Sequence, residues 1–148
     1  MMTADTNVFV YTFGAESEPK TLAARRVVEF LQDMQAPIGL QVVGELQNAL
    51  RRKLKHPAPL AALNVRQVLT AFDTFAPSRA NAEEAIDFMS IARFSYWDGL
   101  LVTAARDAGC TVFFSEDMHD GARLGDLEIV NPFGAGGLSD RARVLLNI

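Results

Sequence analysis

The sequence predicts an α/β fold in which helices cover both faces of a central, mostly parallel β-sheet. The chain has 148 residues, of which 49% are hydrophobic, so it can bury the core of one domain spanning residues 1–148. Short runs of strand composition alternate along it with longer segments of helical spacing. This alternation is typical of a three-layer α/β/α sandwich, here with a sheet of four or five strands.

The first elements are short strands on either side of a helix. Met1–Ala4 is expected to form a strand that runs into Asp5. The apolar residues of Lys20–Gln35 fall on one side of a helix, and Pro37 stops that helix. Ile38–Val42 follows as a mostly apolar run that favours a strand.

Three helices are predicted in the middle of the chain. Val43–Lys55 has apolar residues at helical spacing and ends before Pro57. Leu60–Phe75 is expected to form the next helix, with Pro77 at its exit, and Ala80–Phe94 the one after it.

A further helix is predicted over Trp97–Ala108. Ser95 is a good N-cap residue, and Asp98 follows three residues later as in a capping box. Gly109 suits the C-terminal cap of this helix. Thr111–Phe114 is rich in β-branched and aromatic residues, which predicts a core strand.

The C-terminal part is predicted to be mostly loop around one last strand. Ser115–Gly125 is rich in Asp and Gly, as loops are. Leu127–Val130 favours a strand, whereas Gly134–Gly137 is expected to be flexible. Arg141–Leu146 is expected to add a terminal helical turn.

Four acidic residues fall where one edge of the sheet can collect them. Asp5, Glu45 and Asp117 closely follow predicted strands, and Asp98 opens a predicted helix. Ligands of such sheets bind beyond the carboxyl ends of the strands. Crowded carboxylates raise one another's pKa, and a hard divalent cation relieves this repulsion. We therefore expect a site for Mg²⁺ or Mn²⁺.

The composition argues against a disulfide, a zinc site, a membrane span and secretion. The single cysteine, Cys110, cannot form an internal disulfide, and with only His56 and His119 it cannot build a usual zinc site. No run approaches the length of a membrane span, and no secretory signal is recognisable, so we expect a cytoplasmic protein without a membrane partner.

A basic run stands out against the formal net charge of −4. It consists of Arg51, Arg52, Lys53 and Lys55. Two interpretations stay open: a solvated helix end, where cations suit the dipole, or a surface that contacts RNA.

Four motifs in fixed order carry a resemblance to a known family. They are Asp5-Thr6-Asn7, Gln41-Val42-Val43-Gly44-Glu45-Leu46, Tyr96-Trp97-Asp98-Gly99-Leu100-Leu101 and Ser115-Glu116-Asp117-Met118, closed by Val130-Asn131-Pro132-Phe133. Each motif alone is weak. Together, over Ala4–Phe133, they resemble PIN-domain ribonucleases, and among them the toxins of VapBC-type toxin–antitoxin pairs.

The resemblance implies a metal-dependent endoribonuclease that hydrolyses phosphodiester bonds with Mg²⁺ or Mn²⁺. It also implies a homodimer that is inhibited by a cognate antitoxin. The carboxylates of Asp5, Glu45, Asp98 and Asp117 would be the metal ligands and catalytic residues. Thr6, Asn7 and Ser115 have side chains that can orient carboxylates or a metal-bound water, although Asp-Thr-Asn is also an ordinary turn sequence.

Structural roles compete with functional ones at several of these residues. Asp5 and Asp98 can serve as helix caps, and Glu45 as an exposed helical carboxylate. Asp117 can be an ordinary loop residue, with Glu116 as the competing ligand. Trp97 can stack a base, but packing in the core is the favoured interpretation.

Three other functions remain to be weighed. A nuclease of RNA processing or DNA repair would share the fold and the site. A non-catalytic binding module of the same fold would usually lack one of the four carboxylates, and none is lacking here. A phosphoryl-transfer protein needs a late lysine, whereas no lysine follows Lys55 and no phosphate-binding Gly-rich loop is present.

Overall fold

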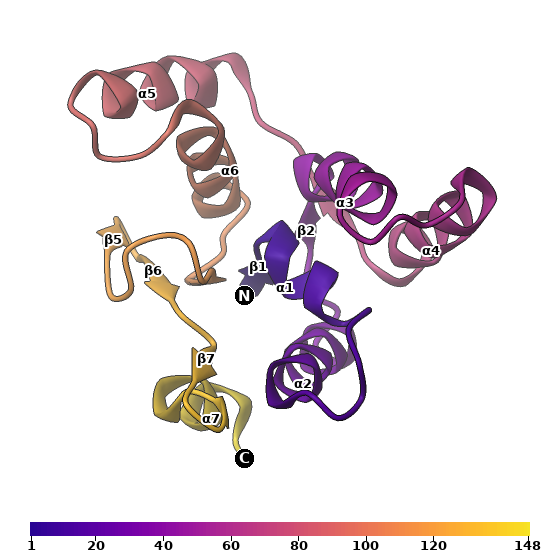
Figure 1. Ribbon diagram of the computed structural model, residues 1–148. Coiled ribbons are helices and arrows are strands. Elements are labelled where there is room, and N and C mark those ends of the chain that lie inside the picture. The colour runs from indigo at the N-terminus through magenta and orange to yellow at the C-terminus, as the bar shows by residue number, and fades with distance from the viewer.

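The structure, a computed structural model, describes all residues from Met1 to Ile148. Seven helices and eight strands alternate along the chain (Figure 1). The strands are β1 Met2–Ala4, β2 Ile38–Gly39, β3 Thr74–Phe75, β4 Val112–Phe114, β5 Arg123–Leu124, β6 Leu127–Val130, β7 Phe133–Gly134 and β8 Gly137–Leu138. The helices are α1 Thr6–Tyr11, α2 Pro19–Asp33, α3 Leu40–Arg52, α4 Ala58–Ala71, α5 Arg79–Ser90, α6 Tyr96–Asp107 and α7 Asp140–Leu146.

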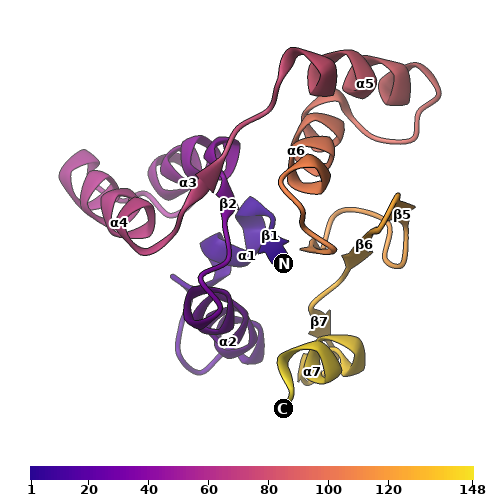
Figure 2. The ribbon, with the colours of Figure 1, turned by 180° about the vertical axis from the view of Figure 1, so that it is seen from behind.

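The central sheet has four strands in the order β1-β4-β6-β5. β4 pairs in parallel with both β1 and β6, while β5 pairs antiparallel with β6. Helices α5 and α6 lie on one side of this sheet, and α2 and α7 lie on the other (Figures 1 and 2). The predicted three-layer α/β/α sandwich with a mostly parallel sheet is confirmed.

The core is built around β4, because this strand lies between two parallel neighbours. Phe113 and Phe114 are fully buried, and Leu127 and Ile129 of β6 are buried beside them. Phe9 of α1 packs into the same core with 1% of its surface exposed. The β-rich run that predicted this strand is therefore the centre of the molecule.

None of the helices combines the length and the apolar character that a membrane crossing requires.

One predicted strand is largely helical. Within Ile38–Val42 only Ile38 and Gly39 are extended, and they pair in parallel with β3 rather than with the central sheet. Helix α3 begins at Leu40, and the helical conformation places Val42 in the row of buried apolar side chains on one face of this helix. This row, the buried stripe of α3, consists of Val42, Val43, Leu46, Ala49 and Leu50. The predicted strand was thus wrong beyond Gly39.

The C-terminal loops contain short strands that were not predicted. Phe133–Gly134 and Gly137–Leu138 pair as the antiparallel hairpin β7–β8, and Phe133 is buried there, while the flexibility of Gly134–Gly137 stays a prediction. Within the predicted loop Ser115–Gly125, Arg123 and Leu124 form the edge strand β5. In both places short strands pair locally, which a run rich in Gly and polar residues does not signal.

Candidate active site

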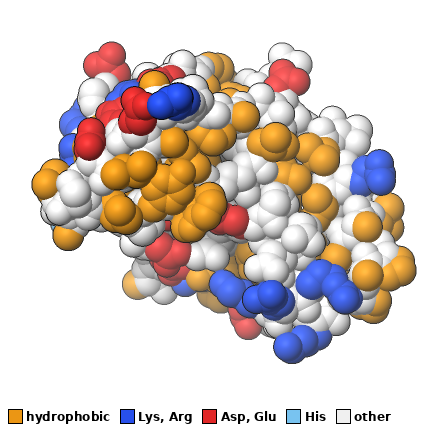
Figure 3. Space-filling model, turned by 90° about the horizontal axis from the view of Figure 1, so that it is seen from above, with side chains coloured by type: hydrophobic (Ala, Val, Ile, Leu, Met, Phe, Trp, Pro, Cys, Tyr) orange, Lys and Arg blue, Asp and Glu red, His pale blue; other side chains and the backbone are white.

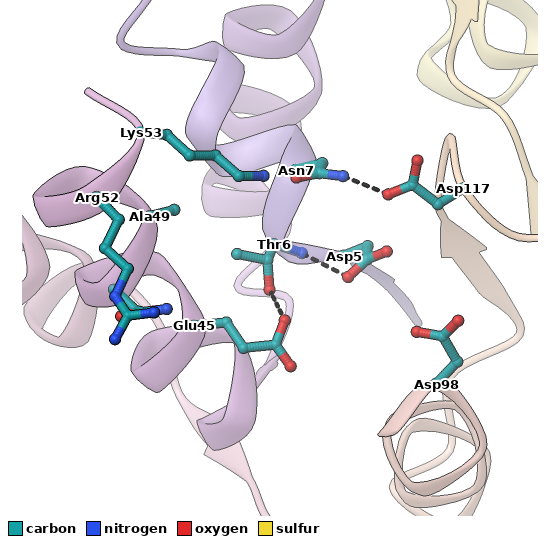
Figure 4. Close-up of a pocket in the computed structure, with 10 residues that line it drawn as sticks. Asp5, Thr6, Asn7, Glu45, Ala49, Arg52, Lys53, Asp98 and Asp117 are labelled. Atoms are coloured by element: carbon teal, nitrogen blue, oxygen red, sulfur yellow. Dashed lines mark hydrogen bonds between the residues drawn. The ribbon is translucent and has the colours of Figure 1, made fainter. Parts of the chain in front are cut away.

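A pocket lies where β1 and β4 end (Figure 4). Its lining residues are Asp5, Thr6, Asn7, Glu45, Asn48, Ala49, Arg52, Lys53, Asp98 and Asp117. All four carboxylates that the sequence singled out line this pocket. They come from the β1–α1 junction, from α3, from α6 and from the loop after β4.

Asp5 is held rigidly at the end of β1. Its backbone N–H donates to Phe114 O at 2.8 Å, which continues the pairing of β1 with β4. Its carboxylate accepts from the Thr6 backbone N–H at 2.7 Å and from Ser115 Oγ at 3.0 Å. Asp5 is therefore the N-cap of α1 and a pocket residue at once. Burial, aided by the charges of Asp98 and Glu45, raises its pKa to about 6.

Glu45 lies in the second turn of α3 and is fixed by two donors. Thr6 Oγ1 donates to Glu45 Oε2 at 2.7 Å, and Gln41 Nε2 donates to Glu45 Oε1 at 2.7 Å. The same Gln41 amide donates to the backbone O of Trp97 at 3.1 Å. Gln41 thereby links the carboxylate on α3 to the start of α6. Figure 4 shows Glu45 turned toward Thr6.

Asp98 occupies the first turn of α6 and faces the same pocket. Its backbone N–H donates to Ser95 Oγ at 3.2 Å, so Ser95 is the N-cap as predicted. Burial raises the pKa of Asp98, the hydrogen bond with Ser95 lowers it, and the charges of Glu45 and Asp117 raise it further. The helix start therefore supplies both a cap and a pocket carboxylate.

The loop after β4 sends its two acidic side chains in different directions. Asp117 accepts from Asn7 Nδ2 at the pocket. Glu116 instead accepts from Lys20 Nζ and from the Tyr11 hydroxyl, away from the pocket. Burial alone would raise the pKa of Glu116, but these hydrogen bonds lower it. Asp117, and not Glu116, is thus the loop residue that lines the pocket.

The donor set fits a hard divalent cation. Carboxylate oxygens are the ligands that Mg²⁺ and Mn²⁺ prefer. No group of three or more acidic, His or Cys side chains is assembled closely enough to hold one ion as it stands. Three of the carboxylates are instead held by hydrogen bonds: Glu45 from Thr6, Asp117 from Asn7 and Asp5 from Ser115. Binding an ion therefore requires that some carboxylates rotate inward.

The basic run divides between two surfaces. Arg52 and Lys53 line the pocket, and Lys53 extends toward Asn7 in Figure 4. Arg51 turns away, since its guanidinium donates to His56 O at 2.9 Å and borders a separate groove between α3 and α4. Lys55 does not line the pocket either.

Sequence reasoning missed two amides and misjudged one aromatic residue at this site. Gln41 and Asn48 lie one turn before and one turn after Glu45 on α3, so helical spacing would have found them. Trp97 was expected to pack in the core, yet 62% of its surface is exposed. The expectation failed because Gly99, Leu100 and Leu101 supply the buried part of the first turns of α6.

The fold and the pocket define an α/β protein with an acidic site at the carboxyl edge of a parallel sheet. The family model of the PIN domain matches residues 2–120, so the chain belongs to the PIN-domain family. No curated protein sequence matches the chain significantly.

Solved structures of toxins and toxin–antitoxin complexes share this fold. A toxin–antitoxin complex from Klebsiella pneumoniae matches with a TM-score of 0.65 and 16% identity, over 90% of this chain and 98% of that one. VapC20 of Mycobacterium tuberculosis, a toxin that cleaves the sarcin–ricin loop, matches with a TM-score of 0.58 and 21% identity, over 79% and 92%. VapBC2 of Rickettsia felis, bound to a DNA fragment from its promoter, matches with a TM-score of 0.63 and 13% identity, over 86% and 96%.

Proposed function

We propose that this protein is an endoribonuclease that depends on Mg²⁺ or Mn²⁺ and is the toxin of a type II toxin–antitoxin pair. The observation that carries the proposal is the pocket itself, where carboxylates from four separate segments face one space in a PIN-domain protein. The similarity to a toxin that cleaves the sarcin–ricin loop supports RNA as the substrate.

The residues of the pocket divide into ligands, orienting groups and substrate contacts. Asp5, Glu45, Asp98 and Asp117 would hold the cation. When bound there, the cation would supply a water of lowered pKa as nucleophile and positive charge against the phosphate.

The orienting groups are hydrogen-bond donors to these carboxylates. Thr6 donates to Glu45, Ser115 to Asp5, and Asn7 to Asp117, so three carboxylates keep defined directions. Arg52 and Lys53 line the remaining wall, where cations attract the phosphates of an RNA strand. The strand would therefore be drawn to the pocket despite the net charge of −4.

We also propose a cognate antitoxin and a second copy of the chain as partners, in the cytoplasm. The Klebsiella pneumoniae and Rickettsia felis structures are complexes of toxins with antitoxins, which supports the antitoxin. Exposed apolar side chains of this protein give a partner a surface to cover. Figure 3 shows hydrophobic side chains gathered over α5 and α6, and Ile86 and Met89 of α5 are exposed.

The test of the nuclease is a cleavage assay on mixed RNAs, with Mg²⁺ or with EDTA, in which fragment ends are read. The parent is expected to cleave with Mg²⁺ only. Asp5→Asn and Asp98→Asn should each lower the rate by orders of magnitude, because each removes a negative ligand from the pocket. Asp126→Asn is the matched control, since Asp126 is exposed in the β5–β6 turn, and it should cleave at the parental rate. Parental rates in Asp5→Asn or Asp98→Asn, or cleavage in EDTA, would contradict the proposal.

A further inference from the structure

The chain's only tryptophan is exposed and lies one residue before a carboxylate of the acidic pocket. Trp97 directly precedes the pocket residue Asp98 in the first turn of α6. Its exposed fraction is 62%, a high value for a large side chain that is mostly buried on average. Most of the Trp97 side chain is therefore accessible to a ligand.

The position of Trp97 is fixed relative to two carboxylates. Its backbone O accepts from Gln41 Nε2 at 3.1 Å, and the same amide donates to Glu45 at 2.7 Å. One amide group has two N–H donors, so both bonds form together. The indole also packs edge-to-face against Tyr96, with ring centroids 5.1 Å apart. The indole is thus held on a backbone that is tied to the site.

The positive charges of the pocket add to Trp97 a feature that single-stranded nucleic acids bind. Arg52 and Lys53 line the pocket on α3, whereas Asp98 and the preceding Trp97 belong to α6. A single strand has phosphates that cations attract and bases that aromatic rings stack, and this pairing of groups is typical of single-strand binding.

We propose that Trp97 stacks on the base of a nucleotide next to the phosphate that is cleaved, in single-stranded RNA. The inference rests on the proposed function and adds a substrate-binding residue to it. Because every base has a π-face, the contact tolerates many sequences and selects unpaired over paired nucleotides. The enzyme would therefore cut loops and single strands in preference to duplex.

A protein partner is the competing occupant of Trp97, because Ile86 and Met89 on the neighbouring helix α5 are also exposed. Two features favour a base. Trp97 is adjacent in sequence to a pocket carboxylate, and its carbonyl shares one amide donor with another. If Trp97 contacted only a protein partner, its backbone would not need the hydrogen bond through Gln41 to the pocket carboxylate Glu45.

The first experiment measures the fluorescence of Trp97 in the full-length chain, in EDTA so that RNA stays intact. A short single-stranded RNA is titrated alongside an RNA of equal length with abasic sites, and binding of both is followed by anisotropy of an end label. We expect saturable quenching by the intact RNA and little by the abasic RNA. Equal quenching by both, or binding of intact RNA without quenching, would overturn the inference. So would a blue shift that depends on protein concentration alone, since it would mean that a second copy covers Trp97.

The second experiment measures cleavage of a single-stranded RNA with Mg²⁺. Trp97→Ala should raise KM by about 5- to 100-fold, the range that loss of one stacked base produces, and Trp97→Phe should recover most of the loss. Val144→Ala, which truncates an exposed apolar side chain of α7, should keep the parental KM. If the parent cleaves and Trp97→Ala keeps its KM, this inference fails alone. If the parent cleaves no RNA, the proposed function fails.

Discussion

Asp5 is the only carboxylate among the buried residues, so its surroundings decide its charge. Burial raises its pKa from 3.8 to about 6, against the hydrogen bonds from Thr6 and Ser115. The free energy that this shift represents is about 3 kcal/mol, which the fold loses whenever the group is ionised. A cation beside Asp5 would recover part of it, which is the physical reason to expect one there.

The pH dependence of stability tests this description of Asp5. Because the pKa is higher in the folded state, the folded chain binds more protons than the unfolded chain between about pH 4 and pH 6. Stability therefore falls as the pH rises through this window. Asp5→Asn is neutral and of similar size, so in EDTA it should exceed the parent by about 2 kcal/mol at pH 8 and match it near pH 4.

Chemical denaturation at both pH values measures the difference. The control Asp126→Asn, in the β5–β6 turn, should follow the parental pH profile. A variant Asp5→Asn that is less stable than the parent at pH 8 would show that ionised Asp5 stabilises the fold.

Two of the carboxylates lie at helix starts that side-chain caps fix, since Asp5 caps α1 and Ser95 caps α6. Ser95 caps α6 by accepting from the Asp98 backbone N–H at 3.2 Å, so the residue that starts the helix also fixes Asp98. Helix α6 is held against α5 by a close approach, since a Cβ on Gly99 would lie 3.3 Å from Ala85 Cα. Arg106 of α6 also forms two hydrogen bonds with Glu84 of α5, at 2.7 and 2.8 Å.

Removal of the α6 cap should therefore affect both stability and activity. Ser95→Ala is expected to lower the free energy of unfolding by about 1 kcal/mol and to lower the cleavage rate at low Mg²⁺, because Asp98 loses its fixed position. Ser139→Ala is the matched control, since Ser139 caps α7 in the same way. It should cost similar stability and leave cleavage unchanged. Equal effects of both variants on cleavage would mean that Ser95 acts only on stability.

The sequence predicted the elements whose patterns are local. Thr111–Phe114 was predicted to be a core strand because its own residues are β-branched or aromatic, and all three residues of β4 are buried. Ile38–Val42 was mispredicted because its apolar residues fit a strand and a helical stripe equally well. Only the packing of Val42 with the rest of the α3 stripe separates the two. Pairing between distant short strands, such as β2 with β3, leaves no signal in a local run.

The candidate site was more predictable than its supporting residues. The four carboxylates line one pocket because strand ends and a helix start bring them there, which the alternation of elements already implied. Gln41 and Asn48 lie one turn from Glu45 on α3 and were within reach of helical spacing, whereas the exposure of Trp97 depends on how α6 packs. That exposure emerges only from tertiary contacts.

At the scale of the whole molecule, an acidic chain carries two cations in the wall of its acidic pocket. The net charge is −4, yet Arg52 and Lys53 line the pocket. Each phosphate contact of a single strand contributes a slope of about −0.7 to the dependence of log affinity on log salt. Long-range repulsion by the chain as a whole is screened at moderate salt, so the local cations dominate binding.

Binding of single-stranded RNA at several salt concentrations measures this contribution. Lys53→Ala should weaken binding and reduce the salt slope by about 0.7, because it removes one cation from the pocket. Arg51→Ala removes the same charge from the neighbouring position, where the guanidinium donates to His56 O, and should change the slope little. Identical salt slopes in the two variants would mean that the cations of the basic run attract RNA only through their combined charge, and that Lys53 contacts no phosphate of its own.

The central claim is that four carboxylates from separate segments close on a divalent cation. The most direct measurement is the anomalous diffraction of crystals of the parent soaked in Mn²⁺. The account predicts one strong peak bonded to Asp5 and to at least two of Glu45, Asp98 and Asp117, with these side chains rotated toward it. A soaked crystal without a peak in the pocket, its carboxylates still held by Thr6, Asn7 and Ser115, would contradict the account.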